Sequence, residues 1–126
     1  MKTLLLIATL SLQSGSGSQP CAVAQSQSRE MQGRFSPKEI CRVEQKVPLL
    51  RVGMSQEEAL KTLGLWKQRK KLWAGVIAHG GRVMHSLGSG YVLEFYWSEY
   101  ITGTLKRATL YHHSEGKEQI IARAGE

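Results

Sequence analysis

The sequence contains no aspartate and no asparagine, and all ten of its acidic residues are glutamates. These absences exclude the usual calcium-binding loops, any N-glycosylation site and a catalytic triad of the Ser-His-Asp type. The missing aspartate makes a hydrolase less expected. A hydrolase is not excluded, because glutamate can replace aspartate in a triad. Three prolines and 13 glycines are too few for a fibrous or low-complexity chain.

Negative charge is also scarce. The sequence contains 17 Lys and Arg residues and ten Glu, which gives a net charge of +7 with neutral histidines. This excess favours anionic partners in general without identifying one. The 126 residues, 41% of them hydrophobic, suffice for one globular domain with an ordinary core.

Long apolar runs are missing except near the N-terminus. Lys2 precedes an apolar run over residues 4–12, and a Ser/Gly-rich stretch then leads to Ala22-Val23-Ala24. This order is typical of a secretion signal. The run is about half of the roughly 20 residues that a spanning helix needs, so we expect no transmembrane helix in the mature chain. We predict a signal peptide over residues 1–24 and export to the periplasm, the cell envelope or the secreted space.

The cleavage site decides the fate of the two cysteines. Cleavage after Ala24, which the sequence favours, removes Cys21 and leaves Cys41 as a buried thiol. Cleavage near residue 16 or 18 keeps both, and an oxidising compartment could then join them. Lipidation of Cys21 is a third alternative, although Ser18 and Pro20 fit a lipid-attachment motif poorly.

Two capping boxes predict two short helices after a flexible polar tether over residues 25–34. In each box a serine precedes a glutamate by three positions, as Ser36 precedes Glu39 and Ser55 precedes Glu58. Each pair can satisfy free backbone N–H groups at a helix start. Gly64 suits the left-handed residue that ends the second helix.

Beyond the second helix the apolar period changes from about 3.6 to 2. Extended segments are predicted at Leu72–Ala78, Tyr91–Trp97 and Leu105–His112, with turns at residues 79–81 and 98–104. Two short N-terminal helices followed by a three- to four-stranded antiparallel sheet make an α+β domain over residues 35–114. Residues 115–126 are a C-terminal tail whose order the pattern does not determine.

Residues 50–64, Leu-Arg-Val-Gly-Met-Ser-Gln-Glu-Glu-Ala-Leu-Lys-Thr-Leu-Gly, carry a family resemblance. The segment resembles the Gly-Met-Thr-x-x-x-Val-x-x-x-Leu-Gly signature of the SmpA/OmlA outer-membrane assembly lipoproteins and of β-lactamase-inhibitor-protein-like domains. The resemblance implies an α-α-β-β-β layout. It also implies a small envelope or secreted module whose sheet and loops contact other proteins without catalysis.

A basic-aromatic segment is the candidate binding site. Residues 66–73 place four cations between two indoles: Trp66, Lys67, Arg69, Lys70, Lys71 and Trp73. Cations and aromatic planes together can bind a polyanion or a lipid interface. The alternative is that both tryptophans anchor the core on either side of a solvated basic loop.

No pattern predicts a catalytic residue, a metal site or a cofactor. The four histidines, His79, His85, His112 and His113, are scattered, and adjacent residues of a strand point to opposite faces. The Gly88–Gly90 segment is predicted as a turn around Ser89 rather than a nucleophile elbow. Nothing in the sequence fixes the separation that Glu94 and Glu99 would need as an acid and base pair.

The sequence therefore predicts an exported, non-enzymatic protein-interaction module of the cell envelope or secreted space, with another envelope or secreted protein as its partner. The alternative is a binder of anionic lipid or polysaccharide acting through residues 66–73. Export makes nucleic acid an unexpected partner. A third hypothesis, a small hydrolase, requires Ser89 or Cys41 to meet a histidine in a cleft.

Overall fold

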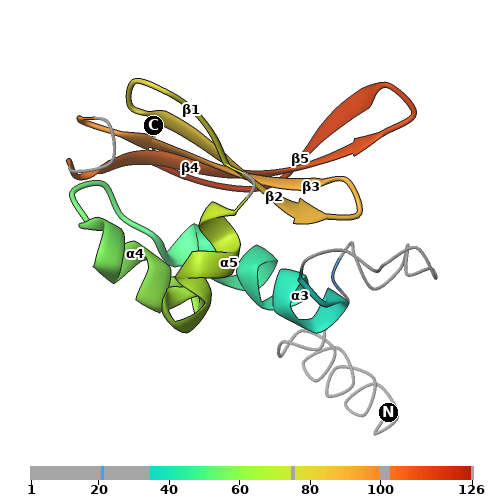
Figure 1. Cartoon of the computed structure of the whole chain (residues 1–126), viewed down its shortest axis with the longest axis horizontal. Helices are drawn as coiled ribbons and strands as arrows, with labels where there is room; N and C mark the ends of the chain where they lie inside the picture. The colour runs from blue at the N-terminus through green and yellow to red at the C-terminus, as the bar shows by residue number, and fades with distance from the viewer. Residues whose placement is uncertain (1–20, 22–34, 75, 100–102, 126) are drawn as a thin grey trace, which may run out of the picture.

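The structure, a computed structural model, describes residues 21, 35–74, 76–99 and 103–125. The tether predicted over residues 25–34 and the signal peptide predicted over residues 1–24, apart from Cys21, lie outside the described residues. The described part has two layers, with all helices packed on one face of an antiparallel sheet (Figure 1).

Helix α3 (Pro37–Lys46) begins at the first predicted capping box. The backbone N–H of Glu39 donates to Ser36 Oγ at 3.1 Å, and the Ser36 N–H donates to Glu39 Oε1 at 2.8 Å. A 3₁₀ turn, η1 (Val47–Leu49), follows because Pro48 cannot continue the α-helical hydrogen bonding. The inner face of α3 buries Ile40 and Val43.

Helix α4 (Gln56–Leu63) begins at the second capping box and ends as predicted. Ser55 caps the N–H of Glu58. Gly64 adopts a left-handed conformation with φ 77°, and the Leu65 N–H donates to the Leu60 carbonyl at 2.8 Å. This pairing closes the helix because glycine enters the left-handed region without steric penalty.

The sheet is a meander with the strand order β1-β2-β3-β4-β5. Its strands are β1 (Val76–His79), β2 (Arg82–Gly88), β3 (Tyr91–Trp97), β4 (Leu105–Ser114) and β5 (Lys117–Gly125). Alternate residues of central β3 face the helices and are buried: Tyr91, Leu93, Phe95 and Trp97. The alternation arises because successive side chains of a strand point to opposite faces.

The numbers of helices and strands differ from the prediction. The described residues form three α-helices instead of two, because α5 (Arg69–Trp73) occupies the start of the segment predicted as a strand over Leu72–Ala78. A 3₁₀ turn, η2 (Trp66–Gln68), precedes α5. Helical geometry carries Leu72 into the core, where it is fully buried.

The sheet has five strands rather than three or four. Two strands lie outside the predicted extended segments. One is β2, and the other is β5, which is formed by residues of the predicted C-terminal tail and pairs with β4 from Arg107 to Ser114. Ala122 and Ala124 lie opposite Leu110 and Ala108 and face the helices. Ile121, at the register shift next to Ala122, also packs against the core. The first four residues of β5 are exposed. Its sequence therefore lacks a clear alternation of apolar and polar residues.

Candidate binding site

The basic-aromatic segment is divided between two environments. Trp73 packs toward the sheet, with its ring edge-on to His85 at a centroid distance of 4.9 Å. His85 is buried, and its Nδ1 lies 3.1 Å from the Leu72 carbonyl oxygen, to which it donates. These contacts make Trp73 part of the support between α5 and β2, and they remove it from the candidate surface.

Lys71 is turned toward α3. Its Nζ lies 3.8 Å from Glu39 Oε1 and 4.5 Å from the centroid of the Phe35 ring. Gln68 Nε2 donates to the other Glu39 oxygen at 2.6 Å. The Lys71 and Gln68 side chains therefore hold α5 and η2 against the start of α3.

Glu39 is ionised under ordinary conditions despite being partly buried. Burial acts to raise the pKa of its carboxyl, but hydrogen bonds from Gln68 and Ser36 and the charge of Lys71 outweigh it. The net effect lowers the pKa below the ordinary 4.5.

A second environment surrounds Trp66, which is half-buried. The Arg69 guanidinium lies over the indole at 4.2 Å from its centroid, and Arg69 Nη1 donates to the Trp66 carbonyl at 2.7 Å. Lys61 Nζ lies 5.9 Å from the same ring. A surface hollow of about 280 Å³ is lined by Lys61, Gly64, Trp66 and Lys67.

Arg42 of α3 completes this arrangement. A Cβ atom at Gly64 would lie 2.9 Å from Arg42 Cδ, so the Arg42 side chain passes close over Gly64. We call Arg42, Lys61, Trp66, Lys67 and Arg69 the Trp66 cluster. Its members come from α3, α4, η2 and α5, and the sequence segment 66–73 contains only three of them.

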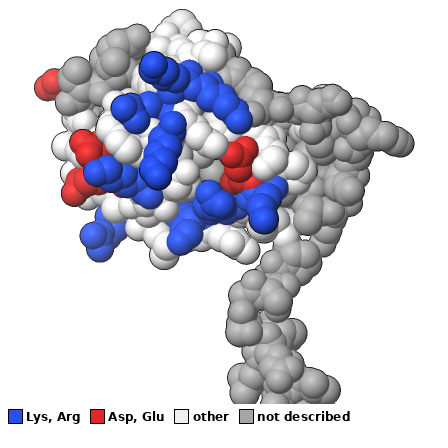
Figure 2. Space-filling model, turned by 60° about the horizontal axis from the view of Figure 1, so that its bottom comes forward, with Lys and Arg blue, Asp and Glu red and all other residues white. Residues whose placement is uncertain are grey.

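Positive charge is concentrated in the helical layer. Residues 35–74 contain nine Lys or Arg and four Glu, whereas residues 76–125 contain five and four. Two of the four glutamates in the helical layer already pair with lysines, Glu39 with Lys71 and Glu57 with Lys61. Figure 2, which brings the helical side forward, shows blue side chains spread across this face with few red ones between them.

The exposed cations of this face suit a polyanion. Lys67 and Lys70 are exposed, and among the described residues neither forms a salt bridge. A cation held over an aromatic ring keeps its outer N–H groups directed at solvent. The surface can therefore attract several phosphate, sulfate or carboxylate groups at once.

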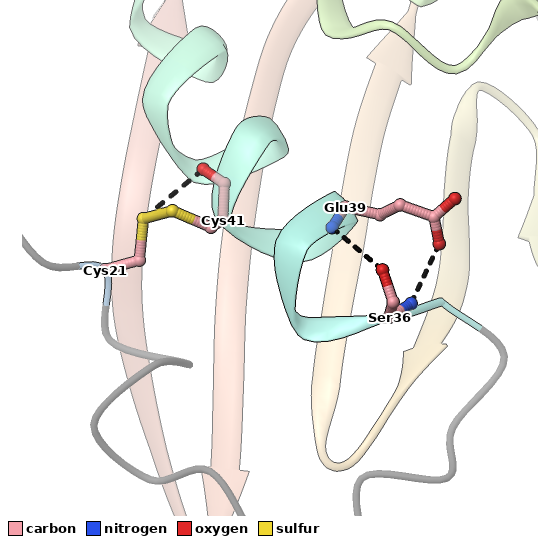
Figure 3. The surroundings of a disulfide bond; sticks show 4 residues. All are labelled: Cys21, Ser36, Glu39 and Cys41. Carbon is pink, nitrogen blue, oxygen red and sulfur yellow. Dashed lines mark hydrogen bonds between the residues drawn. A yellow bond between two sulfur atoms is a disulfide. The ribbon is translucent and has the colours of Figure 1, made fainter.

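The structure joins the two cysteines in a disulfide (Figure 3). The Cα atoms are 5.4 Å apart, and Cys21 is 2% exposed. Cys21 Sγ also contacts the Cys41 carbonyl oxygen at 3.5 Å; since a disulfide sulfur carries no hydrogen, this contact is not a true hydrogen bond. The disulfide is incompatible with cleavage after Ala24 and with lipidation of Cys21.

The other residues considered from the sequence do not converge on a catalytic arrangement. Cys41 has no free thiol. Ser89 lies in the turn between β2 and β3 with φ 54°, and its buried Oγ has no hydrogen-bond partner in the described part of the chain. Glu94 is buried in β3, whereas Glu99 is exposed in the segment after it.

The histidines are dispersed over the domain. His85 lies in the core, His112 stacks on Tyr91 with centroids 4.3 Å apart, and His113 Nε2 lies 3.4 Å from a Glu118 oxygen. Within residues 21, 35–74, 76–99 and 103–125, no three His, Cys or Glu side chains gather where they could hold a metal ion.

Sequence reasoning missed Arg42 and Lys61 in the Trp66 cluster. Lys61 carries a weak signal, because it precedes Gly64 by one helical turn and so borders the same surface. Arg42 carries none, since its position beside Gly64 depends on how α3 packs on α4.

No protein-family model, curated protein or solved structure matches this chain. The resemblance of residues 50–64 to the SmpA/OmlA lipoproteins therefore stays a prediction that depends on that segment alone. Among the described helices, none is both long and apolar enough to cross a membrane.

Proposed function

We propose that this chain is an exported, non-enzymatic binding domain of the cell envelope or secreted space, and that its helical layer binds an anionic surface. The observation that carries the proposal is the Trp66 cluster. Lys61 and Arg69 lie over its half-buried indole, Lys67 lines the same hollow, and Arg42 passes over the neighbouring Gly64. Anionic lipid headgroups and acidic polysaccharides present the matching charges.

The disulfide and the candidate nucleophiles support the rest of the proposal. Disulfides persist in oxidising compartments, as export would require. Cys41 is oxidised, and no base lies within hydrogen-bond distance of Ser89 Oγ among the described residues, so neither nucleophile of the hydrolase hypothesis is activated.

The test is binding to vesicles of phosphatidylcholine with and without phosphatidylglycerol, and to a sulfated polysaccharide. The variant replaces Lys61, Lys67 and Arg69 together by Gln. Each cation near an anionic membrane contributes about 1 kcal/mol. The triple variant should therefore bind anionic vesicles about 100-fold more weakly, with a reduced dependence on salt.

A matched control removes the same number of charges from the sheet by replacing Lys106, Lys117 and Arg123 with Gln. The control should retain most of the binding, because these residues lie outside the helical layer. Equal loss in both triple variants would reduce the effect to net charge and contradict the proposal. Binding to the polysaccharide but not to the vesicles would identify the source of the anion.

A protein partner, the first hypothesis from the sequence, is the second candidate. It is favoured by a different surface, the face of the sheet turned away from the helices, which combines arginine, tyrosine and exposed isoleucine side chains.

A further inference from the structure

The outer face of the sheet carries an ordered polar cluster. Arg82 of β2, Tyr96 of β3 and Arg107 of β4 lie directly opposite one another across three strands. The neighbouring row places Glu94 between Met84 and Thr109. Paired residues of antiparallel strands share a face, and the helix-facing residues of β3 are Leu93, Phe95 and their alternates. Both rows therefore point away from the helices.

The acid in this cluster is satisfied internally. Glu94 is 2% exposed, and its two carboxylate oxygens accept from Arg82 Nε at 2.5 Å and from Tyr111 Oη at 3.1 Å. Burial raises the pKa of the Tyr111 hydroxyl, and the Glu94 charge raises it further, so this group remains a donor at neutral pH. Glu94 therefore stabilises the surface and offers little negative charge to a partner.

The arginines are only partly satisfied. The Arg107 guanidinium lies 4.3 Å from the Tyr96 ring centroid, and Arg82 approaches the same ring at 6.0 Å. Among the described residues Arg107 has no carboxylate partner. Arg123 of β5 adds another cation to this face, opposite Thr109. A guanidinium stacked on a ring is held in orientation and keeps its N–H edge free for two parallel hydrogen bonds to a carboxylate.

Apolar side chains flank the cluster. Ile77 of β1 lies in the Glu94 row and is 56% exposed, and Ile120 of β5 lies opposite Tyr111 and is 51% exposed. They are two of the four large hydrophobic side chains that are exposed in the described part of the chain. Neither a polysaccharide nor a nucleic acid backbone would bury isoleucine, whereas a polypeptide can supply apolar side chains beside an acid. Tyrosine and arginine are also the residues enriched where protein interfaces bind most strongly.

We propose that the outer face of the sheet, centred on Tyr96 and Arg107, binds a protein segment that presents a glutamate or aspartate carboxylate between apolar side chains. The carboxylate pairs with Arg107, and the apolar neighbours cover Ile77 and Ile120. The site is separate from the Trp66 cluster, which lies on the opposite side of the two-layer domain.

The experiment selects binders to the intact, disulfide-bonded protein from a library of random peptides displayed on phage. Enriched peptides should carry Asp or Glu next to apolar residues. The best of them, made synthetically, should bind Arg107→Gln at least about tenfold more weakly, since charge-assisted hydrogen bonds are lost. Arg107→Lys should also weaken binding, because a lysine keeps the charge but not the paired donors.

Two control variants distinguish binding at this face from a general effect of charge and from binding at the Trp66 cluster. Lys106→Gln removes one charge from the same strand and should leave peptide binding unchanged. The triple Gln variant of Lys61, Lys67 and Arg69 should also bind the peptide normally, whether or not it still binds vesicles. Thermal melts establish that each variant is folded.

Three results would overturn the proposal: selection without enrichment of acidic residues, equal affinity for wild type and a folded Arg107→Gln, or loss of the peptide only in the Trp66-cluster variant. The last result would assign the acidic peptide to the helical face. Failure of vesicle binding alone would leave the sheet site supported and remove only the proposed function.

Discussion

Glu39 shows how much of this small domain can depend on a single carboxylate. It completes the capping box of α3 with Ser36, and it also holds the side chains of Gln68 and Lys71 from the segment that leads to α5. One side chain therefore connects the start of the first helix with the segment that carries Trp66.

Replacing Glu39 with Ala should lower the free energy of unfolding by about 1–2 kcal/mol at pH 7, through loss of the cap and of a charge-assisted hydrogen bond. Because folding lowers the pKa of Glu39, its contribution is complete above the ordinary value of 4.5 and disappears as the pH falls through the folded-state value. The difference between wild type and variant in urea unfolding should accordingly shrink at acid pH.

Glu57→Ala provides the control for this measurement. Glu57 forms an exposed i,i+4 pair with Lys61, and such pairs contribute no more than about 0.5 kcal/mol. A Glu39→Ala effect that is no larger than that of Glu57→Ala, or one that is unchanged between neutral and acid pH, would show that the carboxylate does not link the two helical segments.

At the scale of elements, the disulfide fixes α3 to a residue 20 positions earlier in the chain. Closing a loop of this length stabilises a protein by about 3 kcal/mol in the chain-entropy description. The covalent link acts near α3, one of the elements that supports the Trp66 cluster through Arg42.

Cys41→Ser should therefore reduce the free energy of unfolding by about 3 kcal/mol, measured by urea denaturation of the oxidised protein. Cys21→Ser should have the same effect, and the double variant should be no worse than either single one, because both remove the same bond. Additive losses would indicate that each cysteine stabilises the fold by packing, not through the disulfide.

Elements with a local chemical signal were predictable, and those defined by packing were not. The capping boxes at Ser36 and Ser55 and the helix end at Gly64 are confirmed. They were predictable because each depends on residues only three or four positions apart. The alternation in β3 identified the central strand for a similar reason. Strand β5 was missed because an edge strand with four exposed residues lacks that alternation.

The candidate site was likewise predictable where it depends on local sequence and not where it depends on packing between elements. The sequence identified the basic segment but not how its side chains divide between two environments. Lys71 and Trp73 point away from Trp66 because they contact Glu39 and His85, which lie on other elements. Arg42 joins the cluster, and Arg107 meets Tyr96, only through tertiary packing and strand register. Such contacts have no counterpart in local spacing.

At the scale of the whole molecule, the described residues present two different surfaces on opposite sides of one core. The helical layer is strongly cationic, whereas the outer face of the sheet mixes arginine with tyrosine and isoleucine. A domain of this design can hold an anionic surface on one side and a protein segment on the other. The proposed export agrees with the Cys21–Cys41 disulfide, because disulfides persist in oxidising compartments.

The proposal that the protein is exported with its disulfide intact has one most direct test. This is the intact mass of the protein recovered from the envelope and medium of its native host, before and after reduction and thiol alkylation. We expect a mature chain that begins upstream of Cys21 and retains both cysteines, with no lipid, and that takes up two alkyl groups only after reduction. A product that begins after Ala24, carries a lipid on Cys21 or retains Met1 with two free thiols would contradict it.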